Sequence, residues 1–120
     1  MPKLLIVDDE IDIVEITKKF FTRRGIETFS ASEGHEAMRI IQEKNPDLVL
    51  LDYNLPGLSG KEILKKMREE LKLTTKVIIV TGFETEMVTN ETKDLGVHDC
   101  IHKPLDLNKL ETIVLAAINP

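Results

Sequence analysis

The sequence contains a single cysteine, no long apolar run and no excess of positive charge. Because Cys100 has no partner in the chain, an internal disulfide is excluded, and this composition is typical of a reducing compartment. No apolar run approaches the roughly 18 to 20 residues of a membrane-spanning helix, and the first residues lead into a strand pattern rather than a signal peptide. These features predict a cytoplasmic protein with no membrane association.

Charge and size narrow the class of protein further. The 120 residues carry a formal net charge of −5, so the protein has no general basic surface for nucleic acid or anionic membrane. Its hydrophobic fraction of 42% and charged fraction of 31% are ordinary for a globular protein and unlike those of a disordered one. We predict one domain over residues 1–120 that does not itself bind nucleic acid.

Two apolar runs end directly in acidic residues. Leu48–Leu51 is followed by Asp52 and a Pro-Gly turn, and Leu4–Val7 is followed by Asp8 and Asp9. Apolar runs of this length are typical of strands covered on both faces of a parallel sheet. Such sheets bind ligands at the carboxyl ends of their strands, which is where these acids lie.

Apolar runs and helical periodicities alternate along the whole chain. They predict strands at residues 4–7, 26–30, 48–52, 76–80 and 99–102, with a helix after each strand. Five strands alternating with five helices are typical of an α/β fold with a parallel sheet and right-handed crossovers. Periodicity does not determine the strand order, but a flavodoxin-like, doubly wound order of 2-1-3-4-5 would make the first and third strands neighbours.

Several local signals define the predicted helices. Ser32 is expected to cap the second helix, and Ser59 the third, because Glu62 stands at capping-box spacing. The first helix, over about residues 9–24, is expected to bury Ile13, Ile16 and Phe20, and the third an apolar face that reaches residue 71. The fourth, over residues 84–95, has few apolar anchors and should shift easily.

If the strand ends converge, three carboxylates share one small space. Asp8, Asp9 and Asp52 cannot all stay ionised at close range without compensation, and a hard divalent cation such as Mg²⁺ is the natural one. Lys103 and Thr81, at the ends of the fifth and fourth strands, add a positive charge and a hydroxyl group. This combination is suited to phosphoryl transfer, in which an aspartate can be the nucleophile.

Four short motifs stand at the strand ends in sequence order. They are Val7-Asp8-Asp9-Glu10, Leu51-Asp52-Tyr53-Asn54-Leu55-Pro56-Gly57-Leu58-Ser59-Gly60, Thr81-Gly82 and His102-Lys103-Pro104. Together they closely resemble the receiver domain of response regulators of two-component signalling systems, over essentially the whole chain. The resemblance implies a signalling switch whose only catalysis is its own phosphotransfer and dephosphorylation.

The resemblance also implies a metal site. Asp9, Asp52 and the backbone carbonyl of Asn54 would be direct ligands of Mg²⁺, or of Mn²⁺ in its place, and Asp8 would act through water.

For the phosphoryl group, the resemblance implies that Asp52 is the phosphoacceptor and that a sensor histidine kinase or a phosphotransfer protein is the donor. Thr81 and Lys103 would bind the phosphoryl oxygens, and the bond from Lys103 to Pro104 would be cis. Phosphorylation would then alter the surface formed by the fourth helix, the fifth strand and the fifth helix.

Three positions depart from the family pattern, one of which is Leu95, where a small residue is frequent before the glycine. Cys100 stands where many members carry an aromatic switch residue, which puts the aromatic version of the switch, paired with Thr81, in doubt. Phe83 stands at an often polar position, and we expect it to slow the loss of phosphate.

Two other interpretations remain open on the residues alone. A haloacid-dehalogenase-like phosphatase also uses an aspartate after a strand, but it needs a second aspartate where this chain has Asn54. A receiver-like interaction module with an inactive site is the other. The cognate kinase, the downstream target or output domain, and a phosphorylation-dependent homodimer are not readable from the sequence.

Overall fold

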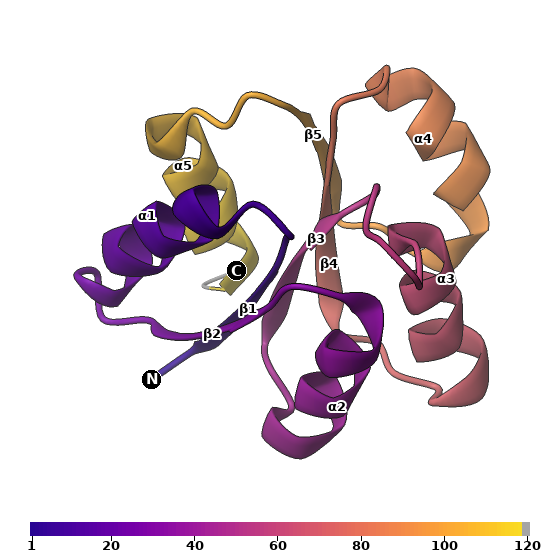
Figure 1. The fold of residues 1–120 in the computed structure, drawn as a ribbon, viewed down its shortest axis with the longest axis horizontal. Coiled ribbons are helices and arrows are strands. Elements are labelled where there is room, and N and C mark those ends of the chain that lie inside the picture. Colours follow the sequence, from indigo (N-terminus) through magenta and orange to yellow (C-terminus); the bar gives the residue numbers. More distant parts are fainter. Residues whose placement is uncertain (119–120) are drawn as a thin grey trace.

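A five-stranded parallel sheet lies between two layers of helices in the computed structural model, which describes residues 1–118 (Figure 1). The strands are β1 (Lys3–Val7), β2 (Glu27–Ala31), β3 (Leu48–Asp52), β4 (Lys76–Thr81) and β5 (Asp99–His102). The α-helices are α1 (Ile11–Thr22), α2 (Gly34–Lys44), α3 (Gly60–Lys65), α4 (Thr85–Thr92) and α5 (Leu107–Ile118). A π-helical turn, η1 (Lys66–Glu70), extends α3, and a 3-10 turn, η2 (Lys93–Leu95), extends α4.

The strand order is β2-β1-β3-β4-β5. This confirms the predicted flavodoxin-like order and makes β1 and β3 direct neighbours, with Val7 opposite Leu51. All five strands belong to one sheet, and the last two residues of the chain, 119–120, lie outside the described part. Within residues 1–118, no helix has both the length and the apolar character needed to cross a bilayer.

Alternate residues of each central strand face two separate hydrophobic cores. In β1, Leu5 and Val7 pack with the layer of α2, α3 and α4, whereas Leu4 and Ile6 pack with α1 and α5. All five residues of β3 are buried because the sheet is covered on both sides. This double cover explains why the central strands have continuous apolar sequences, and it leaves the strand ends as the places where polar groups can gather.

Helix caps agree with the sequence at one predicted position and disagree at another. Ser59 accepts a hydrogen bond from the backbone N–H of Glu62 at 3.2 Å, which confirms the predicted cap of α3. The predicted cap of α2 at Ser32 is wrong, because α2 begins at Gly34 and the cap is Glu33. The longer Glu33 side chain accepts from the backbone N–H groups of both His35 and Glu36, whereas a serine one residue earlier lies too far from the first turn.

Two predicted helix faces are also wrong in part. Ile16 is 58% exposed, because the buried position of that turn is taken by Thr17, whose hydroxyl group donates to the Ile13 carbonyl at 2.7 Å. The expected anchors of the fourth helix are Met87, Val88 and Leu95; Val88 and Leu95 are buried, whereas Met87 is 45% exposed.

The third helix does not continue as a regular α-helix to residue 71. It passes into the π-helical turn η1, in which Met67 is buried and the Arg68 side chain turns toward the loops below the sheet. The Arg68 guanidinium donates to the carbonyl oxygens of Leu95 and Thr75 at 2.7 Å, of Leu73 at 2.9 Å and of Gly96 at 3.2 Å. One side chain therefore joins the end of α3, the entry to β4 and the turn after α4.

We predict that Arg68→Met lowers the free energy of unfolding by about 1.5 to 3 kcal/mol. The part-buried carbonyl groups lose their hydrogen-bond donor, and water replaces that donor poorly. Urea titration monitored by circular dichroism measures the change. The matched control is Arg39→Met: Arg39 makes an exposed ion pair with Glu43, and its loss should change stability by less than about 0.5 kcal/mol. Equal losses in the two variants would contradict a special role for Arg68.

Candidate functional site

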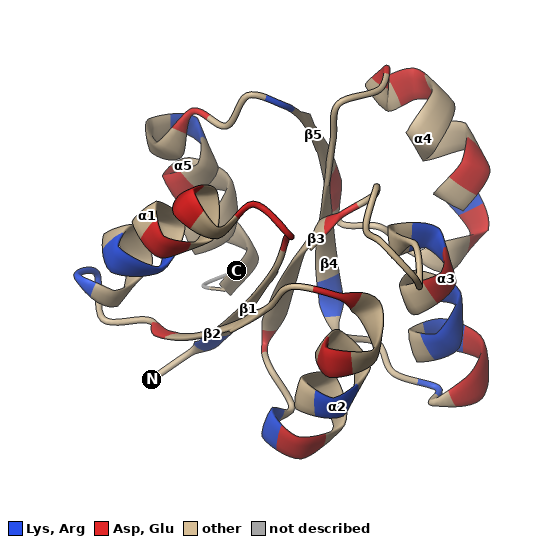
Figure 2. Ribbon diagram, viewed as in Figure 1, with Lys and Arg blue, Asp and Glu red and all other residues tan. Residues whose placement is uncertain are grey.

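Three carboxylates meet at the carboxyl edge of the sheet. Because β1 and β3 are neighbours, Asp8 and Asp9 after β1 lie beside Asp52 at the end of β3, and one carboxylate oxygen of each lies within 4.8 Å of the others. Figure 2 shows this concentration of acidic residues where β1 and β3 end. Asp8 and Asp52 are buried and Asp9 is exposed. The predicted convergence of the strand-end acids is confirmed.

Burial and backbone hydrogen bonds act in opposite directions on Asp8. Burial raises the pKa of Asp8, the hydrogen bond from the Glu10 backbone N–H at 2.9 Å lowers it, and the nearby Asp52 carboxylate raises it again. The net effect is a raised pKa. In the metal-free protein, ionised Asp8 is thus held in a place where its charge is disfavoured.

Asp52 is held from two sides. Its Oδ1 accepts from the backbone N–H of Asn54 at 2.9 Å, and its Oδ2 accepts from the Lys103 ammonium group at 3.0 Å. The strand end is fixed by the next residue, because the Tyr53 backbone N–H donates to the Val80 carbonyl at 2.9 Å. Asp52 therefore presents one oriented carboxylate to the shared space.

Lys103 supplies the positive charge of the site. Its ammonium group lies 3.0 Å from Asp52, 3.1 Å from Glu10 and 3.6 Å from Asp8. Burial lowers the pKa of Lys103, but hydrogen bonds to Asp52 and Glu10 and the attraction of Asp52 and Asp8 outweigh burial, so its pKa is raised. The Lys103–Pro104 peptide bond is cis, as expected, and the Lys103 backbone N–H donates to the Thr81 carbonyl at 2.8 Å. Lys103 is therefore a permanent cation beside the carboxylates.

Glu10 is the site residue to which the sequence assigned no role. Its place in the acidic run with Asp8 and Asp9 was the only sign in the sequence that it belongs to the site. Its contact with Lys103 could not be predicted, because the two residues are 93 positions apart in the chain. Its carboxylate shares Lys103 with Asp52, so Lys103 is held by an exposed acid and a buried one at once.

The remaining predicted residues lie around this group. Thr81 is fully buried at the end of β4, and its hydroxyl oxygen accepts from the Phe83 backbone N–H at 2.9 Å, which leaves the hydroxyl hydrogen free to donate elsewhere. Asn54 lies in the exposed loop that follows Asp52. Cys100 lies apart from the carboxylates, in β5, packed half-buried against the core beneath α4, and burial raises the pKa of its thiol.

The donor set of the pocket is suited to a hard divalent cation. One carboxylate oxygen each of Asp8, Asp9 and Asp52 lies within 4.8 Å of the others. Such oxygen ligands are typical of Mg²⁺, which prefers a few carboxylates, carbonyls and waters. The charge of a divalent cation would also relieve the repulsion among the three carboxylates.

An apolar groove of about 500 Å³ adjoins the carboxylates. Glu10 and Lys103 line one end of it, and Ile13, Ile16 and Leu105 of α1 and the loop after β5 line its apolar part. The exposed Ile16 side chain thus forms part of a surface that leads to the site.

Comparison with known proteins gives one consistent family. The model of the response regulator receiver domain matches residues 4–115. Sporulation initiation phosphotransferase F of Bacillus subtilis is 38% identical over 112 residues, which are 93% of this chain and 90% of that protein. The alkaline phosphatase synthesis transcriptional regulatory protein PhoP of the same organism is 33% identical over 97% of this chain, which spans only 48% of PhoP.

The fold agrees with a solved structure of this family. The response regulator protein TrrA of Thermotoga maritima, in complex with Mg²⁺–BeF, is 29% identical and covers 98% of this chain and 99% of its own, with a TM-score of 0.84. Receiver domains are signalling switches that bind Mg²⁺ in an acidic pocket and interact with histidine kinases or phosphotransfer proteins. With its strand order, its acidic cluster and a match over nearly all of its length, this chain belongs to the response regulator receiver domain family.

Proposed function

We propose that Asp52 is the phosphoacceptor of this receiver domain, and that it takes a phosphoryl group from a phosphohistidine of a sensor kinase or a phosphotransfer protein. The observation that carries the proposal is the buried Asp52 carboxylate, held between the Lys103 ammonium group and the carboxylates of Asp8 and Asp9. A carboxylate that is oriented by a backbone N–H and a cation, at the open edge of a sheet, is placed for attack on phosphorus.

In the transfer, an oxygen of Asp52 forms a bond to phosphorus while the bond from phosphorus to the histidine nitrogen breaks. The electron pair of the broken bond stays on the imidazole, and the product is an acyl phosphate. Most of the catalysis in such reactions comes from positioning and from neutralising charge. Lys103 needs only a small displacement from the Asp52 carboxylate to pair with a phosphoryl oxygen, and Glu10 holds its ammonium group nearby.

The metal that supports this chemistry is Mg²⁺, with Mn²⁺ able to replace it. Asp9, Asp52 and the backbone carbonyl of Asn54 would hold it directly, and Asp8 through water. The bound cation supplies charge neutralisation between the carboxylates and the incoming phosphoryl oxygens.

Phosphorylation is proposed to act as a switch through Thr81 and Lys103. Asp52 is already charged, so the net change in charge is only about −1, and the new acceptor oxygens matter more. Their pull on the Thr81 hydroxyl group moves the end of β4, next to which α4 begins. Coupling of this kind is about 1 to 3 kcal/mol, so the unphosphorylated protein samples the active arrangement.

The donor protein is proposed to approach along the groove between α1 and the loop after β5, because this groove is apolar and ends at Lys103. The output is carried by the surface of α4, β5 and α5, through a separate target, an attached output domain or a homodimer.

The proposal is tested by labelling with acetyl phosphate in the presence of Mg²⁺. We predict that the parent protein gains one phosphoryl group, that chelation of Mg²⁺ lowers the labelling rate at least about tenfold, and that Asp52→Asn abolishes labelling. Mass spectrometry of the intact protein measures the product. Asp47→Asn is the control, since Asp47 lies at the opposite edge of the sheet, and its labelling should equal that of the parent. Labelling of the Asp52→Asn variant, or turnover of a phosphomonoester as a substrate, would contradict the role of Asp52 as phosphoacceptor.

Phe83 gives a prediction about the lifetime of the acyl phosphate. Its backbone N–H donates to the Thr81 hydroxyl oxygen at 2.9 Å, which holds the residue beside the site, and its side chain is 49% exposed. Phe83→Glu should lose the phosphoryl group several-fold faster, because a carboxylate orients water where a phenyl ring excludes it. Met87→Glu, at a side chain that is 45% exposed on α4, should leave the lifetime unchanged. Similar rates for the parent and Phe83→Glu would contradict the shielding role.

Asp8 gives a prediction about stability. Because folding raises its pKa above the ordinary value of 3.8, ionised Asp8 destabilises the metal-free fold above that raised pKa, and the penalty fades as pH falls through it. Asp8→Asn should therefore stabilise the metal-free protein at neutral pH, and the gain should shrink toward acid pH. Urea titrations with and without Mg²⁺ measure this. Added Mg²⁺ should stabilise the parent more than the variant, and equal responses would exclude Asp8 from the metal site.

A further inference from the structure

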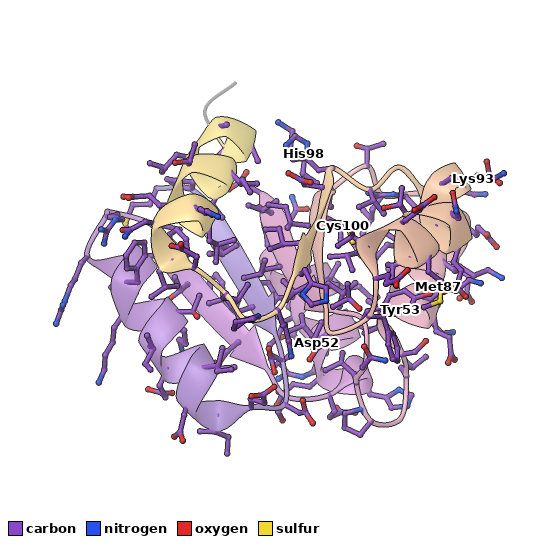
Figure 3. The ribbon with its side chains drawn as sticks, turned by 90° about the horizontal axis from the view of Figure 1, so that it is seen from above. Asp52, Tyr53, Met87, Lys93, His98 and Cys100 are labelled. Carbon is purple, nitrogen blue, oxygen red and sulfur yellow. The ribbon has the colours of Figure 1, made fainter. Side chains whose placement is uncertain are left out.

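Tyr53 follows Asp52 directly and points to the opposite side of the strand end. Its side chain is 8% exposed and belongs to the core that includes Val88 and Leu95, below α4. Figure 3 shows Tyr53 and Cys100 on the side of the sheet that α4 covers. The residue next to the proposed phosphoacceptor is therefore part of the packing under the helix that we propose to move.

The backbone of Tyr53 is fixed in place. Its N–H donates to the Val80 carbonyl at 2.9 Å, and its carbonyl accepts from the Gly60 N–H at 3.1 Å. Gly60 packs so closely that a Cβ atom there would lie 2.7 Å from the Cα of Tyr53. The buried ring and the two backbone hydrogen bonds therefore restrain Tyr53 at the strand end.

The Tyr53 hydroxyl group connects this fixed point to α4. It donates a hydrogen bond of 2.9 Å to Oε1 of Glu91. Burial, the hydrogen bond to Glu91 and the Glu91 charge together raise the pKa of Tyr53 to about 12, so the hydroxyl group remains a donor. A phenol donating to a carboxylate is a charge-assisted bond, stronger than a neutral pair.

Helix α4 has few other attachments. Only Val88 and Thr92 of its residues are buried, and the Thr92 hydroxyl group bonds back to the Val88 carbonyl of the same helix. Between α4 and β5 lies a groove of about 420 Å³ lined by threonines of α4 and by Cys100, whose thiol contacts the Thr89 hydroxyl group. Since the helix is loosely packed on this side, the bond from Tyr53 has a large share in fixing its position.

We propose that the Tyr53–Glu91 hydrogen bond is a latch that holds α4 in the unphosphorylated arrangement, and that it opens when Asp52 is phosphorylated. This rests on the proposed function of Asp52. The bond is present in a structure in which Lys103 contacts the Asp52 carboxylate directly, which is the arrangement without a phosphoryl group between them. Because Tyr53 is restrained, a shift of α4 lengthens the hydrogen bond between Tyr53 and Glu91 and so weakens it. By linkage, a bond made in only one arrangement lowers the affinity for any ligand that favours the other.

Binding of beryllofluoride with Mg²⁺, a phosphoryl mimic, tests the latch by isothermal titration calorimetry. Tyr53→Phe keeps the ring and removes only the hydroxyl group, and it should bind beryllofluoride about threefold to tenfold more tightly than the parent. Glu91→Ala should give the same gain, and the double variant should gain no more than either single one. Glu86→Ala, which removes an exposed glutamate of the same helix, should bind like the parent.

A tighter affinity separates the latch from a merely structural bond, since a loss of general stability does not tighten binding. Glu91 is on the surface, so Glu91→Ala keeps the test valid if Tyr53→Phe folds poorly. Tyr53 is the only tyrosine and the chain has no tryptophan, so the tyrosine emission of the protein comes from this side chain. Beryllofluoride should raise the emission of the parent, because a carboxylate acceptor quenches tyrosine, and should leave Glu91→Ala unchanged.

The outcomes distinguish the latch from the proposed function. If the parent binds beryllofluoride with Mg²⁺ but Tyr53→Phe and Glu91→Ala bind equally or less tightly, the latch is overturned and the role of Asp52 stands. If the parent does not bind the mimic at all, the proposed function fails and the latch fails with it.

Discussion

The repulsion among Asp8, Asp9 and Asp52 is the constraint on which the rest of this structure depends. Two of these carboxylates are buried, and a fold that brings them within 4.8 Å needs a compensating charge. Lys103 provides part of it from the far end of the chain, at the junction of β5 and a cis proline. The negative charge that Lys103 leaves uncompensated is what makes the pocket suited to a divalent cation.

The site is built at the expense of local stability. The raised pKa of Asp8 shows that its ionised form is disfavoured where it stands, and Thr81 is a buried hydroxyl at a strand end. The two hydrophobic cores on either side of the sheet, with the four carbonyl bonds of Arg68 below it, hold these polar groups in place. Parallel α/β folds in general place their binding sites at the carboxyl ends of the strands of a well-packed sheet.

The region proposed to receive the phosphoryl group differs from the region proposed to respond to it. In the proposed mechanism the phosphoryl group is received where β1, β3 and β5 end, whereas the response passes to α4, which has two buried side chains and a groove beside it. A helix held this weakly responds to a change of a few kcal/mol, and the residue that touches both regions is Tyr53. In this chain Cys100 lines a groove beside α4, and the aromatic ring in the core under this helix is that of Tyr53, which directly follows β3.

Local sequence determined the strands, the cap at Ser59 and the placing of acids and Lys103 at strand ends, because alternation, turn residues and capping depend on neighbours a few positions apart. Through the family motifs it also indicated the cis bond before Pro104, although the role of each site residue stays a proposal. Only the tertiary structure decided which side of a helix is buried, as with Ile16 and Met87, and that Glu33 rather than Ser32 caps α2. It alone showed the contacts from Lys103 to Glu10 and from Tyr53 to Glu91. These pairs are 93 and 38 residues apart, and no periodicity connects side chains that only the packing of the sheet brings together.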